Sequence, residues 1–304
     1  RNHSSAASDV YKRQFPYRLA HMFNASLLTA AFLIMGISAW RAMRGVDGPA
    51  TWKVMRTGAL MAAVLAPLQV WIGDLHGLNT LEHQPAKIAA MEGVWETERN
   101  APLTLFGFPD EEQRTTHMAI KVPGLASLIL THEWDGELKG LNEFDGDHPP
   151  VAPVFWAFRV MVGIGVLMVL VGWWSVWKLF RGPRESRDGN VWLLRALSVM
   201  TFSGWVAVLA GWYVTEIGRQ PWVVSGLLRT ADVVADHSSA TVAGTLFGYV
   251  LLYLFLLVSY IAALRYMATK PARSLSLSPQ QRAMEAELDD CLLYTSDAAD
   301  EWLR

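Results

Sequence analysis

Cysteine is almost absent from this sequence, which has one, Cys291, among 304 residues. Disulfide frameworks are therefore excluded, and cysteine ligation is excluded too, because Cys291 falls in a terminal segment that is set apart below. A large excess of either charge is also missing: the formal net charge is −2, so nothing favours a nucleic-acid partner. What the sequence has in quantity is apolar residues, at 52%, and 14 tryptophans.

Five stretches of the sequence carry almost no charge, and each has roughly the 20 residues that a helix needs to cross a hydrocarbon core. A soluble protein can bury one such helix, but five in one chain are hard to place away from lipid. The weakest stretch is short and is interrupted by Pro67. The sequence therefore predicts an all-α integral membrane protein with five transmembrane helices, at Met22–Trp40, Thr57–Gly73, Val160–Trp177, Ala196–Thr215 and Ser238–Leu264.

Positively charged residues follow the first, third and fifth stretches, which end on one side of the membrane if every stretch crosses it. The positive-inside rule makes that side cytoplasmic, so the C-terminus faces inward. The segment Asp74–Val151 and the loop Glu216–His237 are then expected to face outward. The residues that carry this prediction are Arg41, Arg44, Lys53 and Arg56, then Lys178, Arg181, Arg184, Arg187 and Arg195, and finally Arg265, Lys270 and Arg273.

The two ends of the sequence do not fit the rest. Ser4–Gln14 and Cys291–Glu301 look unrelated, yet opposite strands of one DNA sequence that resembles a transposase-type sequencing adapter can encode both. We therefore leave residues 1–14 and 291–304 out of the interpretation of the fold. The rest begins abruptly at a helix start, so a truncated protein that extends before Phe15 is expected. It divides into a helix pair (15–74), an outer segment (75–152), three helices (153–268) and a tail (269–290).

Polar and ionisable residues beside the spans are the functional candidates in a membrane protein. His21, Met161 and Glu216 all fall at the outer level of the predicted helices. Taken singly, they are more simply an interfacial histidine, a core methionine and a solvated carboxylate. Taken together, an imidazole and a thioether make a low-spin haem site, and Arg159 beside such a ligand can pair with a haem propionate.

Lys87 and Glu92 in the outer segment are of the types that a quinol headgroup needs, a hydrogen-bond partner and a proton acceptor. On a helix, residues five apart lie about 140° apart around the axis, so the two do not share one face. A solvated loop helix explains the spacing at least as well.

Four motifs resemble subunit I of the cytochrome bd ubiquinol oxidases: YRLAHMF, AKIAAMEGVWET, FWAFRVMVGIG and GWYVTEIGRQPW. The resemblance runs from Tyr17 to Met267, and GRQPW with its preceding glutamate is its most specific part. It implies a nine-helix family fold, of which five helices are present here, with a periplasmic Q-loop in a bacterial cytoplasmic (inner) membrane. The absent helices would carry the histidine of the oxygen-reactive centre, and the short Q-loop resembles the cyanide-insensitive branch.

The resemblance also implies a role for each candidate residue. His21 and Met161 would ligate the iron of the low-spin haem b, with Arg159 beside that haem, and Glu216 would ligate the high-spin haem b. The other implied roles are quinol oxidation for Lys87 and Glu92, electron transfer between the haems for Trp212, and a place in the high-spin haem region for Arg219.

The predicted function is that of a quinol:oxygen oxidoreductase. Ubiquinol or menaquinol would give electrons at the outer face, which pass through the haems b to haem d, where O2 becomes water. Expected partners are the lipid bilayer, oxidase subunit II and a small accessory subunit. The alternative is a membrane cytochrome b that only relays electrons, which would need His21 and Met161 but not Glu216 with GRQPW.

Overall fold

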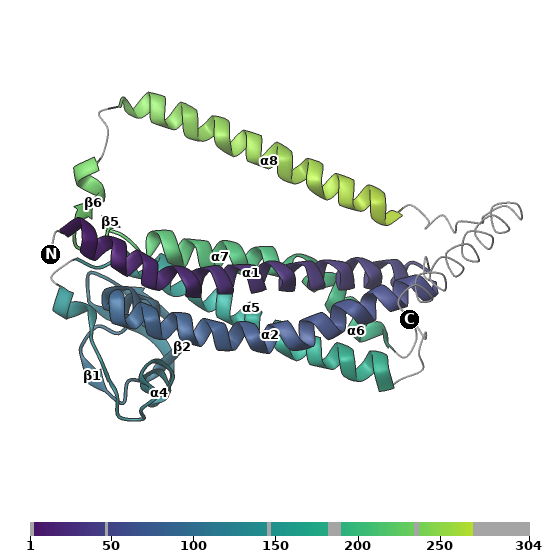
Figure 1. Ribbon diagram of the computed structural model, residues 1–304, viewed down its shortest axis with the longest axis horizontal. Helices are drawn as coiled ribbons and strands as arrows, with labels where there is room; N and C mark the ends of the chain where they lie inside the picture. The colour runs from purple at the N-terminus through teal and green to yellow at the C-terminus, as the bar shows by residue number, and fades with distance from the viewer. Residues whose placement is uncertain (1–2, 46–47, 145–146, 182–189, 234–236, 270–304) are drawn as a thin grey trace, which may run out of the picture. The chain divides into compact units, whose positions relative to one another are not determined.

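The structure is a computed structural model that describes residues 3–45, 48–144, 147–181, 190–233 and 237–269. Contacts within the chain divide it into two units, Arg1–Thr241 and Val242–Arg304. The first unit is a bundle of long helices with a mixed helical and stranded segment at one end (Figure 1). The described part of the second unit belongs to one helix, α8 (Ser239–Thr269).

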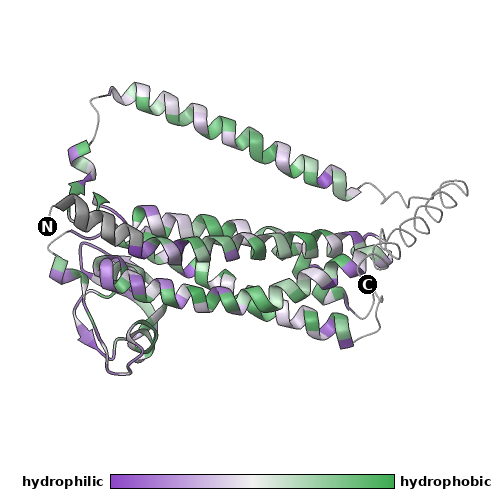
Figure 2. Ribbon diagram, viewed as in Figure 1, coloured by the Kyte–Doolittle hydropathy of each residue, from purple (hydrophilic) through white to green (hydrophobic). Residues whose placement is uncertain are grey.

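Five helical segments in the described part of the chain are long and apolar enough to cross a membrane, which confirms the prediction of an all-α membrane protein. In Figure 2 hydrophilic residues gather toward the ends of the bundle. The segments extend past the predicted apolar stretches because helical hydrogen bonding continues into the polar flanks. They are α1 (His3–Met43), α2 (Pro49–His83), α5 (Val151–Arg181), the α6–α7 segment (Val191–Ile217) and α8.

Several predictions fall at the edge of the described residues or outside them. The helix α1 begins at His3 and so includes most of the segment 1–14. The assignment of that segment to an adapter stays a prediction. Arg184, Arg187 and the chain from residue 270 onward, with Cys291, lie outside the described residues.

Pro67, which interrupts the apolar stretch of the second predicted span, does not break the helix, because α2 continues through this residue. Proline has no N–H, so the carbonyl of Ala63, four residues earlier, loses its partner in the helix. The indole Nε1 of Trp173 in α5 donates to that carbonyl at 3.1 Å. A contact from a neighbouring helix therefore replaces the missing hydrogen bond and keeps α2 continuous to His83.

The fourth span, expected as one helix, is divided into α6 (Val191–Val199), the 3-10 turn η3 (Met200–Phe202) and α7 (Ser203–Ile217). The hydroxyl of Thr201 donates to the carbonyl of Ser198 at 2.7 Å within this turn. An added Cβ at Gly36 of α1 would overlap the Thr201 hydroxyl, and one at Gly204 would overlap Thr29. The close approach of α1 to the turn therefore requires glycine at both positions.

Residues 84–150, which make up most of the outer segment, pack around a core that they share with α5 and α7. It contains α3 (Pro85–Glu92), the hairpin of β2 (Leu103–Asp110) and β3 (Thr115–Val122), and α4 (Leu125–Thr131). Short antiparallel pairs join β1 (Glu98–Arg99) to β4 (Glu137–Leu138) and, after α7, β5 (Trp222–Val224) to β6 (Leu228–Arg229). The turns η1 (Leu141–Phe144) and η4 (Thr230–Val233) complete these regions.

Two buried cores hold the first unit together. One fills the bundle between α1, α2, α5 and α6. The other joins the outer segment to α5 and α7 through Ile88, Leu138, Val151 and Val214. The outer segment and the β5–β6 pair lie at the same end of the bundle, as the predicted topology requires (Figure 1).

Candidate functional site

The short helix α3 carries two of the predicted site residues into the interior. Pro85 is its first residue, and Gly93, with φ of 67°, ends it in a left-handed cap. All residues from Lys87 to Glu92 are buried. A solvated loop helix, which the spacing left open, is therefore wrong, because α3 packs against α5 and the core of the outer segment.

Glu92 is paired with Arg159 of α5. The carboxylate lies 3.5 Å from the guanidinium, and the side chains are 4% and 12% exposed. Burial raises the pKa of Glu92 to about 7, although the neighbouring Arg159 acts to lower it. Glu92 can therefore both hold and release a proton near neutral pH.

Arg159 joins three elements of the first unit. Its Nη1 donates to the carbonyls of Met91 in α3 and Phe155 in α5, and its Nε donates to the carbonyl of Thr104 in β2 at 2.9 Å. Its guanidinium also lies 3.3 Å from the centroid of the Phe155 ring. The guanidinium thus makes its hydrogen bonds within the protein and holds α3 and β2 on α5.

Lys87 extends from α3 toward the end of α7. Its Nζ donates to the carbonyl of Thr215 at 3.4 Å. Its stem passes Gly218, where an added Cβ would come within 2.8 Å of Lys87 Cε. Burial, together with the smaller effects of Arg18 and Arg219, lowers the pKa of Lys87 to about 7, and Glu216 acts in the opposite direction. Lys87 therefore belongs to the same charged cluster as Glu216.

Glu216 and Arg219 form an ion pair at 3.1 Å, with side chains 43% and 27% exposed. In the motif that follows, the Gln220–Pro221 peptide bond is cis. Thr230 donates from its hydroxyl to the amide oxygen of Gln220 at 2.7 Å. The motif thus forms a folded corner at the end of α7.

His21 lies against α2. Its Nδ1 is buried and has no hydrogen-bond partner, and an added Cβ at Gly73 would lie 3.5 Å from its Cε1. Its backbone carbonyl accepts a hydrogen bond from the amide of Gln69, which in turn accepts one from Asn24. One ring nitrogen of His21 is therefore without a hydrogen-bond partner, while the hydrogen bond from Gln69 holds the His21 backbone in place.

His76 is a neighbour of this site that the sequence analysis did not single out. Its ring centroid lies 5.6 Å from that of His21. The sequence gives no local signal for this: His76 and Gly73 share one face of a helix, but that this face meets His21 depends on packing.

Met161 of α5 packs against α7, and Trp212 belongs to α7. An added Cβ at Gly211 would lie 2.9 Å from the sulfur of Met161, so this glycine makes room for the thioether. Trp212 is 56% exposed, and its ring centroid lies 5.7 Å from that of Tyr213. The hydrogen bonds and ion pairs of the described residues do not link His21, Met161 and Glu216, which lie on three different helices.

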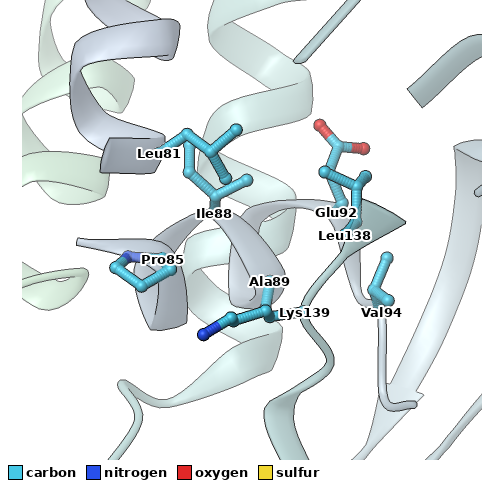
Figure 3. Close-up of a pocket in the computed structure, with 8 residues that line it drawn as sticks. All are labelled: Leu81, Pro85, Ile88, Ala89, Glu92, Val94, Leu138 and Lys139. Carbon is cyan, nitrogen blue, oxygen red and sulfur yellow. The ribbon is translucent and has the colours of Figure 1, made fainter. Parts of the chain in front are cut away.

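A narrow cleft borders Glu92 on the side of α3 that faces β4. Figure 3 shows the Glu92 carboxylate and the Lys139 amine at opposite ends of it. The space open to the centre of a water molecule is about 10 Å³, which is about that of one ordered water. The lining residues are Leu81, Pro85, Ile88, Ala89, Glu92, Val94, Leu138 and Lys139.

Comparison with known proteins identifies a family. The family model described as cytochrome bd terminal oxidase subunit I matches residues 3–272. The chain is 33% identical to cytochrome bd ubiquinol oxidase subunit 1 of Bacillus subtilis (strain 168) over 232 residues, which cover 72% of this chain and 49% of the relative. It is 28% identical to cytochrome bd-II ubiquinol oxidase subunit 1 of Escherichia coli (strain K12), with 87% of this chain and 64% of the relative covered.

A solved structure agrees with this result. The structure of bd oxidase from Geobacillus thermodenitrificans matches with a TM-score of 0.75 and 30% identity, over 83% of this chain and 57% of the matched chain. The sequence resemblance is therefore confirmed at the level of the family. The chain spans about half to two thirds of the length of these relatives.

Proposed function

This chain belongs to the cytochrome bd terminal oxidase subunit I family, and we propose that it forms the haem-binding, quinol-oxidising part of a bd-type oxidase. Two of its relatives are named ubiquinol oxidases and a third a putative menaquinol oxidase, so the substrate class is a quinol. The activity belongs to a full-length subunit, which works with an oxidase subunit II and reduces O2.

The position of α3 supports the proposal most directly. Its two buried ionisable residues reach different helices: Glu92 bonds to α5 close to Met161, and Lys87 bonds to α7 close to Glu216. A carboxylate that accepts a proton and an ammonium that donates a hydrogen bond are the groups that quinol oxidation needs. Both lie beside the helices that would hold the two haems b.

The donor set fits haem. Low-spin haem takes an imidazole and a thioether, and His21 offers a buried nitrogen without a partner, while Met161 has its sulfur against a glycine. When bound, haem accepts and passes on single electrons. Glu216 would hold the high-spin haem b, with Trp212 between the two sites, and haem d would complete the oxidase. The main role proposed for Arg159 is to anchor Glu92, because its guanidinium N–H groups already donate hydrogen bonds within the protein.

The proposed orientation follows from charge. Arg41, Arg44, Lys178 and Arg181 lie at the ends of helices opposite the outer segment, and the positive-inside rule makes that side cytoplasmic. Glu92 would then take up the quinol proton near the periplasmic face, and Lys87 would hold the quinol oxygen. Protons would leave on the outer side.

A reduced-minus-oxidised spectrum tests the haem assignment. Membranes containing the full-length subunit with its partner are compared with the Met161→Leu variant, and Met168→Leu, a buried methionine of the same helix, is the matched control. We expect Met161→Leu to remove or shift the low-spin haem b band while the high-spin b and d bands persist. An unchanged band would make Met161 a core residue only, and absence of a haem d band in the unmodified protein would favour the electron-relay alternative.

A further inference from the structure

Glu92 has two different neighbourhoods. On one side its carboxylate pairs with Arg159, which anchors it to α5. On the other, its side chain forms part of the wall of the cleft between α3 and β4 (Figure 3). Among the described residues that line the wall, Glu92 and Lys139 are ionisable and the others are apolar. The buried Glu92 side chain thus lies between Arg159 and the cleft.

The size of the cleft limits which molecules can bind in it. Pockets for small organic ligands typically enclose about 300–1,000 Å³. This cleft has about 230 Å³ of empty space, part of it open to solvent, and leaves only about 10 Å³ for the centre of a water molecule. A quinol ring is therefore too large for it, whereas one water beside Glu92 fits.

We propose that this cleft is the port through which water carries the proton from Glu92 to the outer solvent, with Lys139 at its rim. The inference rests on the proposed function, because the proton comes from quinol oxidation. It assigns the cleft side of Glu92 a separate role from the side that faces Arg159.

The proton balance is simple. Oxidation of a quinol to a quinone breaks two O–H bonds and releases two electrons, which reduce ferric haem one at a time, and two protons. A proton passes from the quinol hydroxyl to the Glu92 carboxylate. The O–H bond of the carboxyl then breaks toward the water in the cleft, and the carboxylate is restored for the second proton. A pKa of about 7 allows both transfers near neutral pH, since neither form is strongly favoured.

Filling the cleft tests the port. Leu138→Phe enlarges a side chain of the cleft wall, and Leu130→Phe makes the same change in the same core outside the cleft. Both are made in the full-length subunit with its partner and assayed with a short-chain ubiquinol in H2O and D2O. We expect Leu138→Phe to lower kcat about a hundredfold, the low end of what a proton-transfer step contributes, with a larger solvent isotope effect and an unchanged KM. Leu130→Phe should change neither quantity.

The outcomes separate this proposal from the one it rests on. Equal kcat and equal isotope effects in the two variants would overturn the port, and so would a raised KM in Leu138→Phe, because the cleft would then affect quinol binding. If Leu138→Phe loses the low-spin haem b spectrum, the port is tested instead with Ala89→Leu, which fills the cleft from the α3 side. The same kcat, KM and solvent isotope effect are then measured for Ala89→Leu. A full-length protein that oxidises no quinol would instead overturn the proposed function.

Discussion

The ammonium of Lys87 donates a hydrogen bond to the backbone carbonyl of Thr215, so α3 is bonded to α7 one residue before Glu216. The lysine stem reaches this point because Gly218 has no side chain to block it. Glu216, 129 positions away in the sequence, therefore acts to raise the pKa of Lys87. The outer segment is therefore bonded to the end of α7 that carries the proposed haem ligand Glu216, and several consequences can be measured.

Replacing Lys87 with Met should impair quinol oxidation and leave the haems in place. The variant keeps a stem of similar length but loses the hydrogen bond and the charge, so we expect kcat/KM for a short-chain quinol to fall about tenfold or more. Lys121→Met, at an exposed lysine of β3, is the matched control. Loss of the low-spin haem b band in Lys87→Met would assign Lys87 a structural role instead.

Glu92 should make stability depend on pH. Its pKa is raised to about 7 in the folded protein, from 4.5. Between these values the folded state holds a proton that the unfolded state has released, so stability falls as pH rises from 4.5 to 7 and then levels off. We expect Glu92→Gln to flatten this dependence in thermal unfolding of the detergent-solubilised oxidase. An equal slope in both proteins would show that another group is responsible.

Arg159 should be the main attachment of the outer segment to α5. Arg159→Met removes its hydrogen bonds and leaves the Glu92 carboxyl buried without its partner, a type of change that costs about 3–5 kcal/mol. We expect faster amide hydrogen exchange in α3 and β2. Arg229→Met breaks the exposed pair with Asp147, which should contribute at most about 1 kcal/mol. Similar exchange in the two variants would contradict the anchoring role.

Gly36 should tolerate no side chain. A methyl group there would overlap Thr201 of the η3 turn, and overpacking of this kind costs about 1–3 kcal/mol. Gly36→Ala should therefore lower the thermal midpoint of haem loss. At Gly163 of α5 an added Cβ meets nothing within 4 Å, so Gly163→Ala should be neutral or slightly stabilising. If both variants behave alike, α1 and η3 do not pack as closely as described.

The spans could be predicted because membrane helices have a simple requirement. The uncharged stretch at Val160–Trp177, for example, falls inside α5, and lipid demands such a run whatever packs around it. The continuity of α2 through Pro67 could not be predicted in this way. It depends on Trp173, which lies 106 positions away in the sequence and donates to the freed carbonyl of Ala63.

The candidate site, too, could be predicted from the sequence only in part. The angle of about 140° between residues five apart on a helix predicted that Lys87 and Glu92 would point apart, and they reach α7 and α5 respectively. Spacing alone did not tell whether α3 was solvated or buried. Burial depends on the fit of Ile88 and its neighbours against α5, and this fit is not encoded in any local pattern.

The sequence by itself determined the membrane class, the family and the residue types that can ligate haem or take up a proton, because apolar length and short motifs are local properties of the chain. Only the tertiary structure decided that Arg159 holds Glu92, that His21 has an unpartnered nitrogen, and that a cleft the size of one water borders Glu92. These features arise where side chains from separate helices meet, and the distances between such atoms depend on packing rather than on order along the chain.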